Sequence, residues 1–288
     1  MKNKTADLAL ALVAIIWGTG FAASQMALDA RLSPFQIMTY RFFISSVIMI
    51  IIFWREFKKI ELPTIKAGVV IGVFLFLAFA FQTIGLKYTT PSKNAFITAT
   101  NVVMVPFLYW IVLKRKPDKY SIIGAVLTIV GISFLTLEGS FNVKSGDVLT
   151  LVCALGFAMH IISIGYYTKI YSPVQLVIVQ MITAFVLSML SLFFTKDAAM
   201  LTTKGIFAIL YLGVISTTIA FLIQNIAQKH VNATKTAMIL STEAVFGTLS
   251  SIIFLGESLN SKMIIGCIII FVAIIIAETK LDFIKVKS

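Results

Sequence analysis

Ten long apolar stretches, separated by short polar segments, restrict the fold of this 288-residue chain more than any other feature. A helix needs about 20 apolar residues to cross a bilayer, and each stretch is close to that length. Inside a bilayer the backbone must satisfy its own polar groups, which a helix does. The sequence therefore predicts ten transmembrane helices and no separate extramembrane domain. The predicted helices cover Ala6–Leu28, Pro34–Trp54, Ile65–Leu86, Lys93–Leu113, Tyr120–Glu138, Asp147–Lys169, Pro173–Phe194, Lys204–Gln228, Thr234–Leu255 and Lys262–Glu278.

The composition excludes a soluble protein. Hydrophobic residues make up 59% of the chain and charged residues 12%, against about 45–50% and 25% in soluble proteins. The net charge of +12 does not predict nucleic-acid binding, because basic residues in short loops contact anionic lipid. Both cysteines, Cys153 and Cys267, lie in apolar stretches, so we expect neither a disulfide nor a thiolate metal site. We expect an all-α membrane protein without a cofactor.

The distribution of Lys and Arg predicts the orientation. Of the 24 basic residues, 16 fall on the side that holds both termini and 7 on the other, while Arg41 lies within a helix. Loops on the cytoplasmic side of membrane proteins carry the excess of basic residues. We therefore expect a multi-pass protein of the cell membrane, the inner membrane in a bacterium, with both termini in the cytoplasm.

An internal repeat relates the two halves of the chain. Residues 82–136 align without a gap to residues 224–278, and upstream Asp7 aligns to Asp147. The matches that apolar bias does not explain are Gln82 with Gln224, Lys87 with Lys229, Lys93 with Lys235 and Gly124 with Gly266. We expect one five-helix repeat over residues 1–143 and a second over residues 144–288. Because five is odd, the second repeat is inverted in the membrane, an architecture typical of secondary transporters.

Short motifs along both halves carry a further signal. They are Trp17-Gly18, Pro34, Arg41, the run GLKYTTPSKNAFI from Gly85, STEAVF from Ser241, LGESL from Leu255 and IIGCIII from Ile264. Together they resemble the drug/metabolite transporter superfamily, and EamA-type ten-helix exporters in particular. The resemblance covers essentially the whole chain. It implies a bacterial inner-membrane carrier that exports amino acids, their analogues or other small metabolites.

Glu243 is the acidic residue that most needs an explanation. It lies near the middle of the ninth predicted helix, where insertion of a carboxylate costs about 2.5–3.5 kcal/mol. It is therefore expected to face a cavity or a partner. Three roles are open: contact with a substrate amine, a site for a coupling proton, or hydrogen-bonded packing. Asn101 occupies the equivalent position in the first half, so the halves differ chemically here.

Other side chains on these helices are candidate substrate-pathway residues. His160 is a candidate proton relay, although a histidine that bonds to a neighbouring helix is the simpler interpretation. Gln82 and Gln224 are repeat-equivalent amides that need partners inside the protein. Arg41 is interpreted as structural, through backbone carbonyls, an acid or snorkelling. Five aromatic residues complete the candidates, each with simple packing as its alternative: Trp17, Phe21, Phe79, Phe157 and Phe221.

Lys93 and Lys235 are candidate gate residues at opposite faces. They lie at the starts of the fourth and ninth predicted helices, at equivalent repeat positions. A lysine beside a helix N-terminus is locally unfavourable unless an anion binds there, which suggests a passing carboxylate or phosphate. The alternative is that each lysine snorkels to lipid phosphate.

Three classes of function remain: a secondary carrier, an integral-membrane enzyme, and a channel or scaffold. An enzyme would need clustered acids, histidines or a nucleophile with its base, which the sequence lacks. It also lacks the nucleotide-binding patterns GxxxxGK[ST] and GxGxxG. The inverted repeat favours a carrier, and we expect it to be a monomer and not an enzyme. Aromatic residues, two glutamines, an asparagine and a carboxylate in the expected cavity suit amino acids or related amino compounds as exported substrates, with protons as the candidate coupling ion. Exchange of organic anions or phosphate esters is the alternative.

Overall fold

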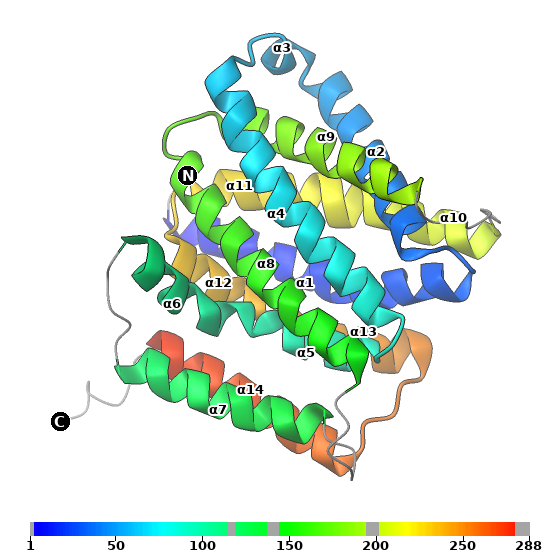
Figure 1. The fold of residues 1–288 in the computed structure, drawn as a ribbon, viewed down its shortest axis with the longest axis vertical. Helices are drawn as coiled ribbons and strands as arrows, with labels where there is room; N and C mark the ends of the chain where they lie inside the picture. Colours follow the sequence, from blue (N-terminus) through cyan, green and yellow to red (C-terminus); the bar gives the residue numbers. More distant parts are fainter. Residues whose placement is uncertain (1–2, 114–118, 137–143, 194–201, 280–288) are drawn as a thin grey trace.

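The computed structural model describes residues 3–113, 119–136, 144–193 and 202–279, and this part of the chain holds helices and no strand (Figure 1). The elements are α1 (Asn3–Asp29), α2 (Pro34–Ile52), α3 (Trp54–Phe57), α4 (Leu62–Leu86), α5 (Pro91–Ala99), α6 (Asn101–Leu113), α7 (Lys119–Thr136), α8 (Ser145–Tyr167), α9 (Pro173–Leu192), α10 (Thr203–Leu210), the π-helix η1 (Tyr211–Ile219), α11 (Ala220–Gln228), α12 (Ala233–Ser241), α13 (Glu243–Leu255) and α14 (Ser261–Thr279).

The predicted ten-span membrane fold is confirmed. Among the described residues, eight helical stretches are long and apolar enough to cross a bilayer, and α7 and α14 contribute two shorter apolar helices. Large apolar side chains such as Phe207, Ile129 and Ile253 are exposed on the outer surface of the bundle. Exposed apolar surface on this scale is stable in contact with lipid and not in water.

Several helices begin at residues that cap them well. Ser33 accepts a hydrogen bond from the backbone N–H of Gln36, whose side chain accepts one from the Ser33 backbone, and Pro34 follows at the first helical position. Thr90 caps α5 in a similar way before Pro91. Proline is favoured there because its missing N–H is one that a helix start leaves unbonded. These signals fix the helix starts more sharply than hydropathy does.

The fourth and ninth spans each break into two helices at the same place in the repeat. Thr100 separates α5 from α6, and Thr242 separates α12 from α13. In both cases the threonine hydroxyl donates to the carbonyl three residues earlier, at 2.6 Å from Thr100 to Ile97 and 2.7 Å from Thr242 to Ile239. Such a bond competes with the regular backbone ladder. Each break therefore starts a new half-helix near the middle of the membrane.

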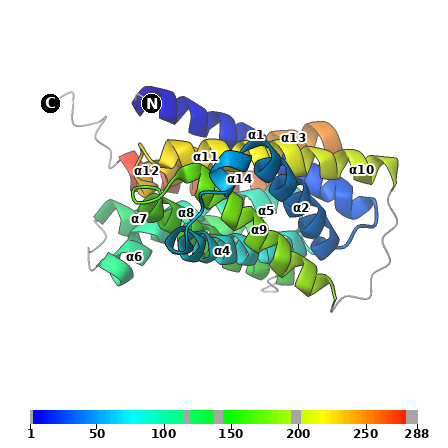
Figure 2. The same ribbon diagram turned by 90° about the horizontal axis from the view of Figure 1, so that it is seen from above.

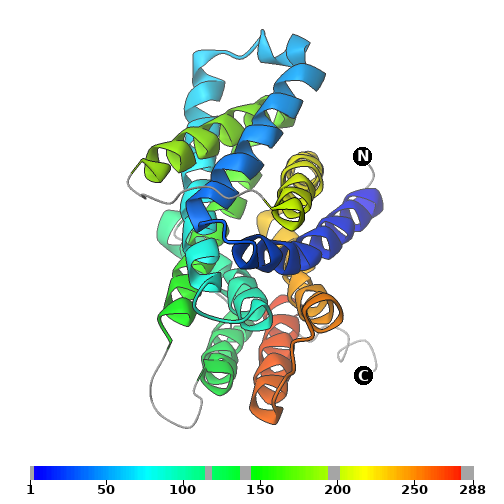
Figure 3. The same ribbon diagram turned by 90° about the vertical axis from the view of Figure 1, so that its right-hand side faces the viewer.

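Helices from both halves surround the centre of the bundle. α4 packs between α8 and α9, whereas α1 packs against α11 and α13. Figure 2 shows α1 on one side of the molecule and α4 on the other. α7 and α14 pack against each other at one end of the bundle, away from the centre (Figure 3). Below, the proximal face is the one at which α1 begins, and the distal face is the one at which α1 ends and α2 begins.

Candidate functional site

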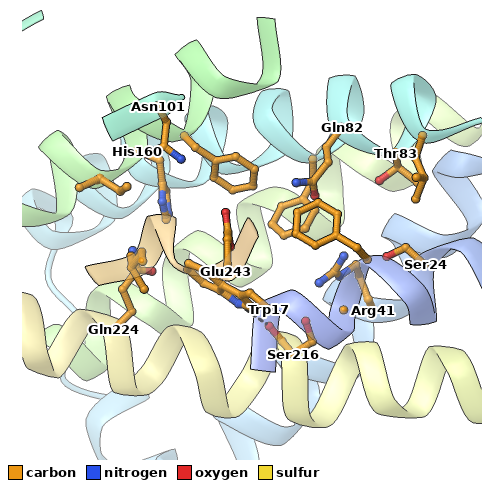
Figure 4. Close-up of a pocket in the computed structure, with 17 residues that line it drawn as sticks. Trp17, Ser24, Arg41, Gln82, Thr83, Asn101, His160, Ser216, Gln224 and Glu243 are labelled. Atoms are coloured by element: carbon orange, nitrogen blue, oxygen red, sulfur yellow. Dashed lines mark hydrogen bonds between the residues drawn. The ribbon is translucent and has the colours of Figure 1, made fainter. Parts of the chain in front are cut away.

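A cavity lies at the centre of the bundle, between helices of both repeats. It contains about 620 Å³ of space not filled by atoms, including space open to solvent. It extends from Ser24 and Leu86, near the distal ends of α1 and α4, to Gln224 in α11. Its lining residues are Trp17, Gly20, Phe21, Ser24, Arg41, Phe79, Gln82, Thr83, Leu86, Asn101, Phe157, His160, Ile161, Ser216, Gln224, Leu240 and Glu243 (Figure 4).

Most of the residues that the sequence suggested for a substrate pathway line this one cavity. The residues brought together are Trp17, Phe21, Phe79, Gln82, Asn101, Phe157, His160, Gln224 and Glu243. Phe221 lies behind this lining, with its ring centroid 4.9 Å from that of Trp17 and 6.0 Å from that of Phe79. The cavity therefore has aromatic walls and a small number of polar groups, a composition typical of small-molecule sites.

Glu243 and Asn101 owe their positions to the two helix breaks. Each is the first residue of the half-helix that follows a break, α13 and α6 respectively. Glu243 is buried, and among the described residues its carboxylate makes no hydrogen bond and no ion pair. Asn101 donates from Nδ2 to the Thr98 carbonyl at 2.9 Å, while its buried Oδ1 has no described partner. The breaks thus place two acceptors at the cavity.

His160 and Gln224 supply further polar atoms without partners. His160 is fully buried; its Nε2 donates to Gln180 Oε1 at 3.0 Å, and its Nδ1 has no partner among the described residues. Gln224 is also fully buried, and neither its Nε2 nor its Oε1 has a partner among the described residues. Buried polar atoms that lack partners are uncommon in folded proteins, and each one requires an explanation.

The repeat-equivalent glutamine differs from Gln224. Gln82 is only partly buried, and its Nε2 donates to Thr98 Oγ1 at 3.3 Å. The cavity wall is therefore more exposed at Gln82, near the distal end, and more enclosed at Gln224. Beyond Gln224, toward the proximal face, Gln228 donates to the Ile161 carbonyl at 3.0 Å and joins α11 to α8. This contact adjoins the cavity on its proximal side, since Ile161 is one of the lining residues.

Arg41, which the sequence analysis interpreted as structural, also lines the cavity. Its Nε donates to Thr217 Oγ1 at 3.0 Å, and its guanidinium carbon lies 4.1 Å from the ring centroid of Phe79. Its side chain points into the cavity that Glu243 also lines (Figure 4). Snorkelling to the interface, one of the three structural explanations considered from the sequence, does not describe this buried side chain.

The π-helix η1 positions a cluster of polar groups that the sequence analysis missed. In a π-helix the backbone hydrogen bonds span five residues, which widens the turn and is frequent at functional sites. The Ser216 carbonyl accepts a 2.9 Å hydrogen bond from Trp17 Nε1, and the next residue, Thr217, holds Arg41. The Thr218 hydroxyl donates to the Gly213 carbonyl, five residues earlier, at 2.7 Å. Hydropathy does not distinguish η1 from the α-helical parts of the span predicted over 204–228.

The two candidate gate lysines lie outside the cavity lining. Lys235 Nζ forms an ion pair with Asp7 Oδ2 at 2.8 Å and so joins the starts of α12 and α1 at the proximal face. Lys93 is buried near the distal face, with 1% of the residue exposed. Lys93 and Lys235 occupy equivalent positions in the two repeats, and so do Asp147 and Asp7. The structure thus separates the lysines from the central site.

Metal chemistry finds no support in the described residues, which contain no group of three or more His, Cys, Asp or Glu side chains placed to hold a metal ion. The polar side-chain groups of the cavity instead consist of one carboxylate, one guanidinium, three amides, one imidazole, one indole N–H and three hydroxyls. Such a set binds and orients an organic molecule by charge and hydrogen bonds.

Comparison with known proteins gives a consistent answer over the whole chain. The sequence pattern that defines the EamA-like transporter family matches residues 4–137 and again residues 144–279. A relative from Archaeoglobus fulgidus, described as an uncharacterized transporter, is 38% identical over 280 residues, which is 97% of this chain and 88% of the relative. The uncharacterized transporter YyaM of Bacillus subtilis is 24% identical over 262 residues and 85% of each chain.

A solved crystal structure shares the fold. It superposes with a TM-score of 0.73 and covers 99% of each chain, at 16% sequence identity. At this identity the likeness concerns the arrangement of helices alone.

Proposed function

Because the chain belongs to the EamA-like transporter family, we propose that it is a secondary transporter that exports small amino compounds by alternating access. The central cavity is the substrate site in this proposal. The bilayer is the cell membrane, and the excess of basic residues favours cytoplasmic termini. Export then runs from the proximal face to the distal face.

The carboxylate of Glu243 is the observation that carries the amino part of this proposal. It is buried, it lines the cavity, and no described residue neutralises it. A buried charge without a partner is costly at membrane depth. A substrate ammonium group would remove that cost, and the amide and imidazole atoms of Asn101, Gln224 and His160 would complete its hydrogen bonds.

The exchange of organic anions or phosphate esters is the weaker candidate. It depends on Lys93 and Lys235 as contacts for the anion. Neither lysine lines the cavity, and Lys235 already has Asp7 as its counter-ion. These positions remove the contacts that the sequence suggested for a phosphate ester, whereas Glu243 in the cavity favours a substrate that carries an amine.

An ion gradient is the proposed source of energy, with protons as the candidate ion. The sequence holds no nucleotide-binding pattern, and the cavity holds two side chains, Glu243 and His160, that can exchange a proton. We propose a monomeric working unit, because residues from both repeats of this chain line the cavity.

Counterflow in proteoliposomes tests the proposal. Vesicles containing the purified protein are loaded with a mixture of unlabelled amino acids, and uptake of labelled amino acids is followed. Saturable exchange that needs the internal load is the expected result. Flux that never saturates would indicate a channel, and saturable exchange of organic phosphates alone would support the anion alternative.

A further inference from the structure

We propose that Arg41 binds the carboxylate of the substrate, so that the cavity selects zwitterions and not simple amines. This inference rests on the proposed function and deepens it, because it assigns the second charged group of the same site. The substrate class it names is an amino acid with both charges free.

The guanidinium of Arg41 has donors left over for a ligand. Arginine carries five N–H donors in a planar fork. Only Nε–H has a described protein partner, Thr217 Oγ1 at 3.0 Å. Arg41 is 2% exposed and lines the cavity. Its remaining N–H donors can therefore bond only to a molecule inside the cavity.

The surroundings of Arg41 hold the guanidinium in one orientation. The ring of Phe79, at 4.1 Å, lies against the guanidinium, and Thr217 holds it through Nε. Stacking on an aromatic ring and one fixed hydrogen bond leave an outer edge for a planar acceptor. A carboxylate matches that edge with two parallel hydrogen bonds, whereas an ammonium group would be repelled.

Glu243 makes Arg41 part of a two-charge site. Both side chains line the same cavity, with Glu243 nearer to Asn101 and His160, and Arg41 nearer to Ser24 and Ser216 (Figure 4). They form no ion pair with each other in the described chain. Two opposite charges that face one cavity without direct contact match a ligand that carries both a carboxylate and an ammonium group.

The aromatic walls complete the description of the ligand. Trp17, Phe79 and Phe157 line the cavity beside the two charges. A substrate with its charged groups on Arg41 and Glu243 would place its remaining atoms against these rings. The site therefore fits an amino acid whose side chain is at least partly apolar.

Three matched ligand sets test the inference on the wild-type protein. These are a mixture of apolar amino acids, the corresponding amino-acid amides, which keep the amine and lose the carboxylate, and the corresponding deaminated acids. Binding is measured as thermal stabilisation of the purified protein, and exchange as counterflow. We expect the amino acids to bind about tenfold or more tightly than either incomplete set, because each lost charge pair removes charge-assisted hydrogen bonds.

Variants assign the effect to Arg41. Arg41→Gln should weaken amino-acid binding by about tenfold or more, and it should bind the amides at least as well as the wild type does. Arg41→Lys keeps the charge and loses the planar fork, so it should lie between the two. Thr217→Val removes only the bond that orients the guanidinium and should weaken amino acids without affecting amides. A purely structural arginine would lower the binding of all ligands alike.

The outcomes separate this inference from the proposed function. If the wild type binds and exchanges amides as well as amino acids, Arg41 is no carboxylate site, while the transporter of amino compounds stands. The same holds if Arg41→Gln keeps full discrimination. If neither amino acids nor amides bind or exchange, both proposals fail. Should Arg41→Gln not fold, the wild-type comparison and Thr217→Val still decide.

Discussion

A buried carboxylate such as Glu243 can hold an amine or carry a coupling proton, and one substitution separates these roles. Glu243→Gln keeps the shape and removes the charge. If Glu243 holds a substrate amine, we expect binding and exchange of the substrate to fall together, by about tenfold to a hundredfold. The measurements are thermal stabilisation and counterflow. The exposed Glu61, also changed to Gln, is the control and should behave as wild type. Intact exchange with lost pH-driven accumulation would instead make Glu243 a proton site.

Substitution of Gln224 tests whether a polar cavity residue lowers the stability of the protein while it raises the affinity for substrate. Both polar atoms of this fully buried side chain lack described partners, a state that costs about 1–3 kcal/mol per group. Gln224→Met has a similar shape without the amide. We expect the variant to unfold at the same or a higher temperature and to bind substrate more weakly. Lower stability with unchanged affinity would show that Gln224 packs and does not bind.

At the residue scale, the sequence indicated most of the polar residues inside the membrane but not the contacts that position them. Glu243, His160 and Gln224 stand out because a polar group at membrane depth needs a partner. Arg41 did not, since a single arginine within a helix has a simple explanation in snorkelling. Its site depends on Thr217, which η1 brings toward it from 176 residues away in sequence. No local pattern predicts that contact.

α1 crosses α13 and η1 closely at Gly18 and Gly20. The two glycines are expected to tolerate substitution by alanine to different degrees. A Cβ on Gly18 would lie 2.4 Å from Phe246 Cβ and 2.8 Å from the Gly247 nitrogen in α13. One on Gly20 would meet the Ser216 hydroxyl at 2.9 Å, an oxygen that can rotate away. We expect Gly18→Ala to lower the free energy of unfolding by about 1–3 kcal/mol and Gly20→Ala to change it little. Thermal unfolding of both variants measures the difference; equal effects would contradict the observed helix crossing.

The ion pair between α12 and α1 tests whether the proximal ends of these helices separate during transport. Lys235 and Asp7 are 42% and 30% exposed, so the pair should contribute less than about 1 kcal/mol. Lys235→Gln should therefore hardly change thermal stability, but should alter transport that starts from the proximal face. Exchanging the two residues, with Asp7→Lys and Lys235→Asp, should restore it. Normal transport by Lys235→Gln from both faces would show that the pair with Asp7 takes no part in transport.

At the element scale, hydropathy predicted the ten spans but not the interruptions within them. Each span consists of about 20 apolar residues, which is a strong signal. The breaks at Thr100 and Thr242 each involve one residue, and the apolar pattern continues across them. Threonine also occurs inside regular helices, so its presence did not mark the breaks. The two breaks occupy equivalent positions in the repeats, and this was recognised only from the structure.

Over the whole molecule, the repeat predicts a second conformation that the structure does not occupy. Thr83 lines the cavity, on the distal part of α4. Its repeat equivalent is Asn225, since residues 82–136 align to 224–278. Asn225 is fully buried and lies outside the cavity lining, beside the contact of Gln228 with Ile161. Thr83 is itself only 2% exposed, so the two positions differ in their contact with the cavity rather than in burial. Alternating access would exchange these contacts, so that Asn225 becomes accessible when Thr83 is covered.

Cysteine accessibility tests this exchange. The background is Cys153→Ala with Cys267→Ala, and the probes are Thr83→Cys and Asn225→Cys, each treated with a water-soluble thiol reagent. A minor conformation is populated to about 0.1–10%, so without substrate we expect position 225 to react at roughly a tenth of the rate at 83 or less. Under exchange conditions the labelling rate at position 225 should rise while that at position 83 falls, because closing the cavity on the distal side opens it on the proximal side. Rates that rise together would indicate a channel that opens at both faces, and rates that never change would rule out the second conformation.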